Sequence, residues 1–296
     1  MPVSLFLWRL LVGIFNGSTL CLNKSESSPR YASTFCSSLS YFLLLLLLLS
    51  GDVHPNPGQR KDKYYNFSLC YWNVGSLQAH NFSKLTLLAS YNSIYKYDMI
   101  CLSETFLDSS FIPNDERLSL DGYEIVRSDH PNDVKRGGVC VYVKSSLAAN
   151  VCNFNRLTEC IVIEIVLNNK KGYIVSLYRS PSQTNDEFDE FIINFDLMLH
   201  DISSLNPSFV MILGDMNAKS SSWCSNDSTS NEGFHIESLT SFYGFSQLIS
   251  NPTHILPTTS SCIDLIFTDQ PNLIMDSGVH SSLHPNCHHQ IVQRSI

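Results

Sequence analysis

Short apolar runs alternate with amphipathic stretches along the chain from about Lys63 onwards. The apolar runs, several of them alternating with period two, predict strands at 67–74, 98–105, 123–129, 137–146, 161–167, 173–181, 209–217 and 262–269. Helical spacing predicts helices at 82–97, 186–202 and 233–245. Many strands with few helices between them indicate a layered α/β sandwich of two packed sheets.

The first 60 residues have a different pattern. Segment 1–15 is apolar but contains Arg9, segment 16–40 is rich in Ser, Thr and Asn, and a leucine run extends from Leu43 to Leu49. A membrane-spanning helix needs roughly 20 apolar residues, so stable membrane insertion is not expected. No basic region directly precedes the run, which makes a signal peptide the lesser alternative. We expect a poorly ordered leader at 1–60, a globular domain at 66–292 and a tail at 293–296.

Composition allows a large core but is unusual for a nucleic-acid binder. Hydrophobic residues make up 44% of the 296 residues, and the formal net charge is -8. Phosphate contacts usually require a basic face, so tight binding of nucleic acid by this domain alone is not expected. A metal-dependent nuclease eases the conflict, because its carboxylates gather around a cation that meets the phosphate. None of the ten cysteines forms a Cys-x-x-Cys pair, and several, such as Cys101 and Cys140, lie inside apolar runs, which is typical of reduced core thiols.

Polar residues stand where the predicted strands end, the place at which sheet proteins carry their sites. Each one alone has a structural explanation as a turn or cap residue. Asp264 is the exception, because a carboxylate inside an apolar strand needs a partner. The ordered set is more specific than any member; it comprises Asn73, Glu104, Tyr178, Asp215, Asn217 and Asp264, followed by His288 and His289 near the end of the chain.

The sequence around these residues resembles that of the endonuclease/exonuclease/phosphatase superfamily, which includes DNase I and apurinic/apyrimidinic endonucleases. The resemblance spans about 66–292 and is closest to the endonucleases of LINE-type, non-LTR retrotransposons. The segments that carry it are Asn-Val-Gly-Ser-Leu at 73–77, Leu-Ser-Glu-Thr-Phe-Leu at 102–107, Asp-Gly-Tyr at 121–123, Arg-Gly-Gly-Val at 136–139, Tyr-Arg-Ser-Pro at 178–181, Gly-Asp-Met-Asn-Ala at 214–218 and Ile-Asp-Leu-Ile-Phe-Thr at 263–268. It implies a DNase I-like, four-layered sandwich of two mostly antiparallel sheets flanked by helices.

The resemblance also implies roles at the metal. Glu104, helped by Asn73, would bind a hard divalent cation, Mg²⁺ with Mn²⁺ as a second choice. Asp215 would deprotonate the attacking water and Asn217 would hold the phosphate beside it.

Further roles at the phosphate follow from the same resemblance. Tyr178 would donate to a phosphate oxygen, and Arg179 is a candidate for a contact to the DNA backbone. Asp264 would hold the catalytic imidazole, which stabilises the developing charge on phosphorus.

The motif that supplies this imidazole departs from the family, where Ser-Asp-His precedes an apolar strand. Alignment on Ile291 makes His288 the catalytic residue, with His289 as the register alternative, and puts Cys287 in place of the Asp. In that register Asp264 should contact His288. A competing interpretation is a zinc site in the same segment, formed by His280, His284, Cys287, His288 and His289.

The leucine run leads into Ser-Gly-Asp-Val-His-Pro-Asn-Pro-Gly-Gln at 50–59, which resembles the 2A-like peptides that make a ribosome skip one peptide bond. His54 replaces the usual Glu, and Gln59 replaces the essential Pro. Glutamine is an ordinary primary-amine acceptor, so skipping should fail in this chain. The alternative interpretation is a Pro/Gly turn between leader and domain.

The sequence therefore predicts a metal-dependent, intracellular DNA endonuclease whose nick leaves a 3′-hydroxyl for reverse transcription; secretion is the lesser alternative. Such domains are normally fused to a reverse transcriptase, and none follows before Ile296. Two alternatives remain open: a superfamily phosphatase acting on a small phosphoester, which the acidic charge suits no worse than DNA, and a catalytically decayed retroelement remnant.

Overall fold

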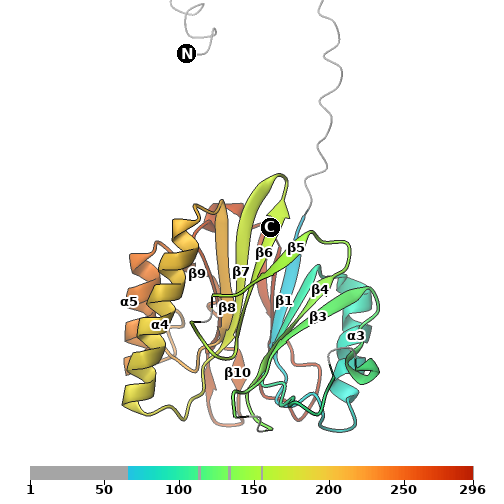
Figure 1. The fold of residues 1–296 in the computed structure, drawn as a ribbon. Coiled ribbons are helices and arrows are strands. Elements are labelled where there is room, and N and C mark those ends of the chain that lie inside the picture. Colours follow the sequence, from blue (N-terminus) through green and yellow to red (C-terminus); the bar gives the residue numbers. More distant parts are fainter. Residues whose placement is uncertain (1–65, 113–114, 133–134, 155, 296) are drawn as a thin grey trace, which may run out of the picture. The chain divides into compact units, whose positions relative to one another are not determined.

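The computed structural model describes residues 66–112, 115–132, 135–154 and 156–295, all within one compact unit that extends from Tyr64 to Ile296. The leader expected at 1–60, with its 2A-like segment, lies outside the described residues. Two six-stranded sheets pack face to face, with helices on their outer sides (Figure 1). The predicted layered α/β sandwich is confirmed.

The first sheet has the strand order β13-β14-β1-β2-β4-β3. Its strands are β1 (Ser68–Asn73), β2 (Met99–Ser103), β3 (Tyr123–Ser128), β4 (Val139–Lys144), β13 (Asp276–His280) and β14 (Ile291–Ser295). β1 and β2 run parallel, and the other neighbours are antiparallel. The sheet is therefore mixed, because a helical crossover joins β1 to β2.

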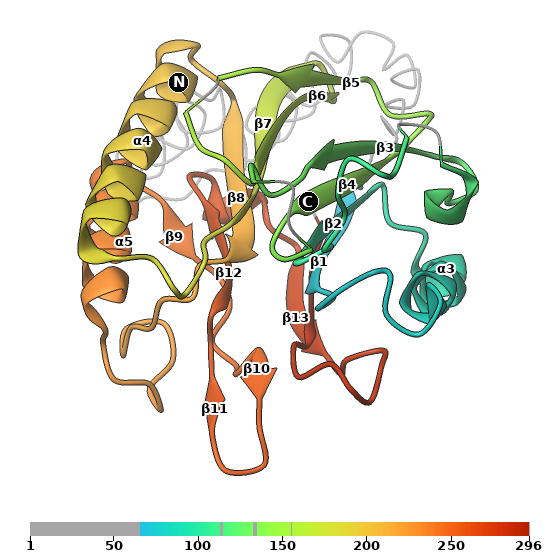
Figure 2. The same cartoon turned by 60° about the horizontal axis from the view of Figure 1, so that its bottom comes forward.

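The second sheet has the order β5-β6-β7-β8-β12-β9. Its strands are β5 (Ala149–Cys152), β6 (Cys160–Leu167), β7 (Lys170–Tyr178), β8 (Phe209–Asp215), β9 (Ser246–Gln247) and β12 (Asp264–Thr268). Here β7 and β8 form the parallel pair. A separate hairpin of β10 (His254–Ile255) and β11 (Ser260–Ser261) projects below β12 in Figure 2.

Helices cover the outer face of each sheet. α3 (Ser83–Tyr95) lies on the first sheet, whereas α4 (Asn185–Ser204) and α5 (Asn231–Phe242) lie on the second (Figure 1). Short 3₁₀ turns occupy Glu116–Leu118 and Pro271–Leu273. α4 begins with a capping box, in which the Thr184 hydroxyl accepts from the backbone N–H of Glu187 and the Glu187 carboxylate accepts from that of Thr184.

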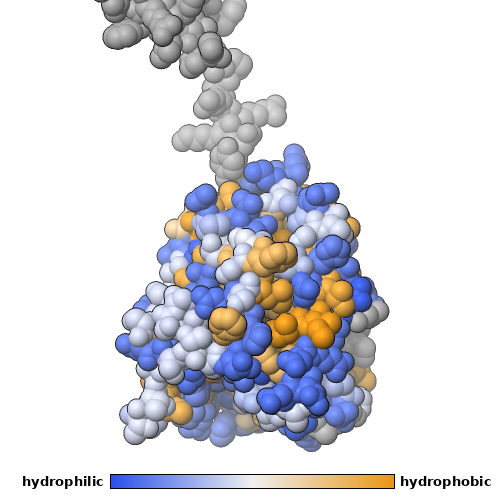
Figure 3. Space-filling model, turned by 90° about the vertical axis from the view of Figure 1, so that its left-hand side faces the viewer, coloured by the Kyte–Doolittle hydropathy of each residue, from blue (hydrophilic) through white to orange (hydrophobic). Residues whose placement is uncertain are grey.

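Strand alternation divides the core into two parts. In β1, Leu69 and Tyr71 face the second sheet, whereas Cys70 and Trp72 face α3. The second sheet is covered by one face of α4, whose buried side chains are Phe188, Phe191, Phe195, Met198, Leu199 and Ile202. The opposite side of α4 and α5 carries exposed apolar residues, including Ile193 and Phe242, among polar ones (Figure 3).

The strands that carry the candidate site end at one edge of the sandwich. Register pairs Tyr178 with Asp215 and Asp215 with Asp264, so three predicted site residues are neighbours across β7, β8 and β12. In the other sheet, Asn73 pairs with Ser103, the residue before Glu104. The two parallel pairs thus bring the ends of β1, β2, β7 and β8 together.

Some expectations need correction. Residues 293–295 are not a tail, since they continue β14 and pair with β1 and β13. Five strands that are short or half-exposed were also not predicted from the sequence, namely β5, β9, β10, β11 and β13. The eight described cysteines are unpaired. Among the described residues, no helix combines the length and the apolar character needed to cross a bilayer.

Candidate active site

Asn73 joins two carboxylates at the strand ends. Its Nδ2 donates to Oε1 of Glu104 at 2.8 Å and to Oδ2 of Asp215 at 2.8 Å, while its Oδ1 accepts from the backbone N–H of Gly75 at 3.1 Å. One amide therefore spans the space between the two sheets. In this arrangement Asn73 acts as a donor to the carboxylates, and its oxygen is engaged by the backbone.

Asp215 is fully buried among polar partners. Its Oδ1 accepts from the backbone N–H of Asn217 at 2.9 Å, and its backbone pairs with that of Asp264. Burial raises the pKa of Asp215, and the negative charge of Asp264 raises it further. A carboxylate in this state binds a proton more readily than an exposed one, which suits a general base.

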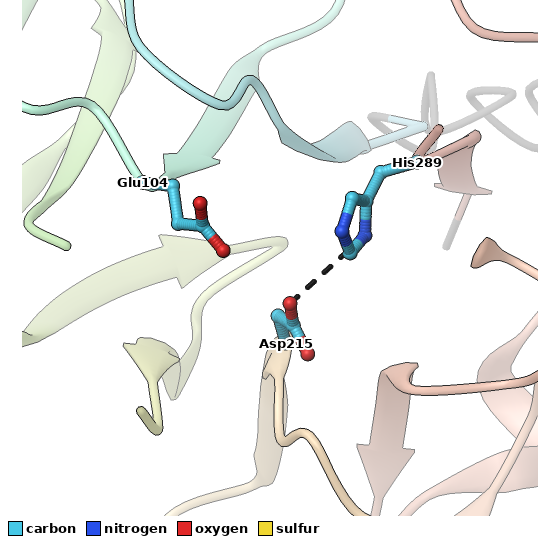
Figure 4. Close-up of side chains that lie close together, drawn as sticks. All are labelled: Glu104, Asp215 and His289. Carbon is cyan, nitrogen blue, oxygen red and sulfur yellow. Dashed lines mark ion pairs between the residues drawn. The ribbon is translucent and has the colours of Figure 1, made fainter. Parts of the chain in front are cut away.

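The imidazole of His289 lies against Asp264. Its Nδ1 is 2.9 Å from Oδ2 and 3.2 Å from Oδ1 of Asp264, and 3.9 Å from Oδ2 of Asp215 (Figure 4). Burial alone would lower the pKa of His289, but Asp264, through charge and hydrogen bond, and then Asp215 raise it to about 10. The two carboxylates therefore favour the protonated form of the ring.

Tyr178 ends β7 and lies beside Glu104. Burial raises the pKa of its phenol, and the carboxylate of Glu104 raises it further, so the hydroxyl remains a donor. Tyr178 also lines a cleft of about 480 Å³, whose walls include Arg136, Arg156 and Gln183. Tyr178 therefore contacts both the candidate site and this cleft.

Glu104 and Asn217 both have left-handed backbone conformations, with φ of 49° and 45°. Glu104 directly follows β2, and its carbonyl accepts from the backbone N–H of Ser76 at 2.7 Å. Non-glycine residues adopt this region at a cost, and such residues gather at functional sites. The turn aims the Glu104 carboxylate towards Asp215 and His289 (Figure 4).

The sequence profile of the endonuclease/exonuclease/phosphatase family matches residues 70–285, more than half of the chain. The chain belongs to this family. No curated protein matches the sequence.

Several solved structures of nucleases share the fold. The endonuclease domain of TRAS1, a telomere-specific non-LTR retrotransposon, superposes with a TM-score of 0.61 at 16% identity, over 78% of this chain and 98% of that domain. An AP endonuclease from Leishmania major gives 0.65 at 13% identity, over 78% and 87% of the two chains. A 3′-5′ exonuclease from Neisseria meningitidis gives 0.60 at 16%, over 77% and 98%.

The prediction that His288 contacts Asp264 is wrong, because His289 takes that place. His289 forms an isolated β-bridge with His254, and burial alternates in this segment, since Cys287 is buried and His288 is exposed. In extended chain, alternate side chains share a face, so Cys287, His289 and Ile291 point inward. His288 is exposed and points the other way, with its ring 6.2 Å from that of His254.

This register also changes which residue of the chain differs from the Ser-Asp-His motif of the family. With His289 as the histidine of Ser-Asp-His, Cys287 stands in the place of the Ser and His288 in the place of the Asp. The thiol of Cys287 is buried and donates to the carbonyl of Asn73 at 3.2 Å, a bond that a serine hydroxyl also makes. In this register the residue that the resemblance would place at the family's Asp is His288 and not Cys287.

Arg179 does not have the placement expected of a DNA contact. It is only 3% exposed, and its guanidinium donates to the carbonyls of Met216 at 2.6 Å and Asn217 at 2.7 Å. The side chain of Asn217 donates back to the carbonyl of Arg179 at 2.8 Å. Arg179 thus supports the turn that carries Asp215 and Asn217 and cannot reach a phosphate from this position.

The alternative zinc site is not assembled. His284 stacks on His80 with ring centroids 5.0 Å apart, and His280 packs against Tyr91 and Tyr95. Within the described residues, the group of His, Cys, Asp and Glu side chains that could hold a metal is Glu104, Asp215 and His289, whose ligand atoms lie within 4.8 Å of one another.

Two supporting residues were not predicted. Lys84 is buried, and its amine donates to the carbonyls of Val74 and of Gly75, which fixes the turn after Asn73. Glu159 is buried and accepts from the backbone N–H of Gly138. Lys84 lies within a predicted helix and Glu159 outside any predicted element, so neither had a sequence signal beyond its charge.

Proposed function

We propose that this chain is a metal-dependent endonuclease that hydrolyses a phosphodiester bond of DNA and leaves a 3′-hydroxyl. The observation that carries the proposal is the placement of His289 between Asp264 and Asp215, opposite Glu104. The buried carboxylate of Asp215, the protonated ring of His289 and the carboxylate of Glu104 then surround one point at an edge of the sandwich. Hydrolysis of a phosphodiester needs this combination of proton acceptor and positive charge.

Each residue has a role in the proposed reaction. In its deprotonated form Asp215 accepts a proton from the attacking water, and burial makes that form a stronger base than an exposed carboxylate. Asp264 orients the ring of His289 through Nδ1, which leaves Nε2 to donate to a phosphate oxygen. Tyr178 donates a hydrogen bond from its hydroxyl to a second phosphate oxygen and keeps its proton, and Asn217 positions the same phosphate.

The family generally requires a divalent metal, and the residues present fit one. Glu104 and Asp215 offer hard oxygen ligands, and their ligand atoms lie within 4.8 Å of each other and of His289. Glu104 would hold the ion, and Asn73 would keep both carboxylates in place. When bound, the cation would supply charge stabilisation to the phosphate. We propose Mg²⁺, with Mn²⁺ as a substitute.

The retrotransposon context is a narrower part of the proposal. It is supported by the sequences of the motifs, such as those at 102–107 and 214–218, and by the similarity to the TRAS1 domain. In such an element the nick would prime a reverse transcriptase normally fused to the nuclease. The 2A-like segment at 50–59 belongs to the same interpretation; it lies outside the described residues.

Nicking of supercoiled plasmid tests the proposal. We expect relaxed circles with Mg²⁺ or Mn²⁺, none with EDTA, and none with Asp215→Asn. A DNA polymerase should extend the nicked strand without prior phosphatase treatment, which requires a 3′-hydroxyl. Release of phosphate from a small ester or from a 3′-phosphorylated oligonucleotide, without any plasmid nicking, would favour the phosphatase alternative. No hydrolysis of any of these substrates would indicate a decayed copy.

A further inference from the structure

Thr253 lies just before β10 and is fully buried. Its hydroxyl oxygen accepts from the backbone N–H of Ile263 at 3.1 Å and from that of Asp264 at 2.9 Å. These two N–H groups immediately precede and begin β12, the strand that carries the Asp264 carboxylate. The Thr253 side chain therefore fixes the backbone from which Asp264 reaches His289.

The backbone of the same residue reaches the other half of the pair. The carbonyl of Thr253 accepts from the N–H of Gln290 at 2.7 Å, and the N–H of Ile255 donates to the carbonyl of His288 at 2.9 Å. His289 is thus held by hydrogen bonds from this segment on both of its sides in the chain. The β10–β11 hairpin that begins here is visible in Figure 2.

We infer that Thr253 is a positioning residue that sets the geometry of the His289–Asp264 pair, and hence the rate of the hydrolysis proposed above. One residue links the strand of Asp264 to the segment of His289, two segments that have no direct backbone pairing in the described structure. Removing the hydroxyl would leave two buried N–H groups without an acceptor, which favours a shift of the start of β12. The inference rests on the proposed function for its effect on rate but not for its effect on geometry.

The test compares Thr253→Val, which keeps the shape but loses the acceptor, with Thr253→Ser, which keeps it. The matched control is Thr268→Val at the other end of β12. Thr268 is also buried, and its hydroxyl donates to the carbonyl of Val210 at 3.0 Å and accepts from the N–H of Gln270 at 3.1 Å. Both valine variants should lower the melting temperature, so loss of stability alone does not distinguish them.

Two readouts do distinguish them. The first is the proton NMR resonance of the His289 ring N–H bonded to Asp264, recorded at fixed pH in EDTA. The second is plasmid nicking with Mg²⁺, separated into kcat and KM. We expect Thr253→Val to move or broaden the resonance and to lower kcat by about tenfold to a hundredfold at unchanged KM, as misplacement of a catalytic group does. Thr253→Ser and Thr268→Val should keep the resonance and a kcat within about threefold of the unaltered protein.

An unchanged resonance in folded Thr253→Val would overturn the inference, as would an equal shift in Thr268→Val. If Thr253→Val does not fold, Thr253→Cys gives the same comparison, because a thiol is a weak acceptor of similar size. If the unaltered protein fails to nick DNA while the resonance still depends on Thr253, the proposed function fails and the positioning of the pair stands. A resonance that depends on Thr253 with normal nicking by the valine variant would overturn its role in rate.

Discussion

Oδ2 of Asp264 lies 2.9 Å from Nδ1 of His289, and no bond of this kind joins Asp264 to the neighbouring His288 among the described contacts. The pair combines a buried carboxylate with a ring that is 15% exposed at its side chain. It therefore decides which of two adjacent histidines serves the proposed reaction.

Substitution of the two histidines should separate them. His289→Ala removes the ring that pairs with Asp264 and should lower kcat for plasmid nicking by about a hundredfold to ten-thousandfold. His288→Ala removes an exposed ring and should leave kcat within about tenfold of the unaltered protein. Equal losses in the two variants, with both folded by circular dichroism, would contradict the register described here.

The change of register gives a second prediction about the family motif. His288 stands in the place of the family's Asp, so His288→Asp should preserve or raise the nicking rate. Cys287→Ser keeps a donor to the carbonyl of Asn73 and should preserve it, whereas Cys287→Asp places a carboxylate against that carbonyl. We expect Cys287→Asp to lower the melting temperature and the rate. A higher nicking rate for Cys287→Asp would instead support the alignment on Ile291, in which Cys287 takes the place of the family's Asp.

The His289–Asp264 pair should make stability depend on pH in the metal-free protein. The pKa of His289 is raised to about 10 in the folded state, above the ordinary value of 6.5. The stabilisation is therefore fully present below pH 6.5 and is lost as the pH rises through 10. Urea unfolding in EDTA should show that His289→Gln costs about 2 kcal/mol at pH 6 and much less near pH 10.5. His200→Gln, at an exposed position on α4, should show no such trend.

Arg179 should affect stability without affecting the salt dependence of DNA binding. Arg179→Met leaves the carbonyls of Met216 and Asn217 without their donor and should cost about 3 kcal/mol in urea unfolding. Arg136, which is exposed in the cleft beside Tyr178, is the contrast. Arg136→Met should reduce the slope of log affinity against log salt by about 0.9 if it meets one phosphate. A reduced slope for Arg179→Met would contradict this prediction and indicate that Arg179 contacts the DNA backbone.

Translation tests the leader. Gln59 supplies a primary amine where the 2A-like family has Pro, so a reporter on each side of Gly58 should be made as one fused product. Gln59→Pro should yield some separated product only if His54 is tolerated. Two products from the unaltered sequence would refute the prediction.

The elements that the sequence predicted are those with a strong periodic pattern. β2, β8 and β12 are buried along their whole length and apolar except at their ends, and α4 has an apolar face and begins with a capping box. β5 and β13 were not predicted, because both are largely exposed and β13 has the polar sequence Asp-Ser-Gly-Val-His. Among the described strands, each is an edge strand that pairs only with the strand that follows it, β6 or β14, and the apolar pattern of an edge strand is weak.

Strand ends also explain how much of the site was predicted. Asn73, Tyr178 and Asp215 are the last residues of their strands, and two parallel strand pairs bring such ends together. His289 follows no predicted strand, and alignment on Ile291 left the choice between adjacent histidines to a one-residue shift. Counting alternate residues back from buried Ile291 would have selected His289. The roles of Lys84 and Thr253 depend on backbone carbonyls and N–H groups that no sequence motif records.

The left-handed backbone of Glu104 has a consequence for how homologous sequences would diverge. A side chain in that conformation costs about 1–3 kcal/mol, a cost that glycine does not carry. Glycine at 104 would relieve this backbone cost but would also remove the acceptor of the Asn73 amide. Relatives that have lost the proposed activity should tolerate glycine at this position, whereas relatives that depend on the carboxylate should not. The residue found there in homologous sequences would therefore indicate whether the proposed role of Glu104 has been under selection.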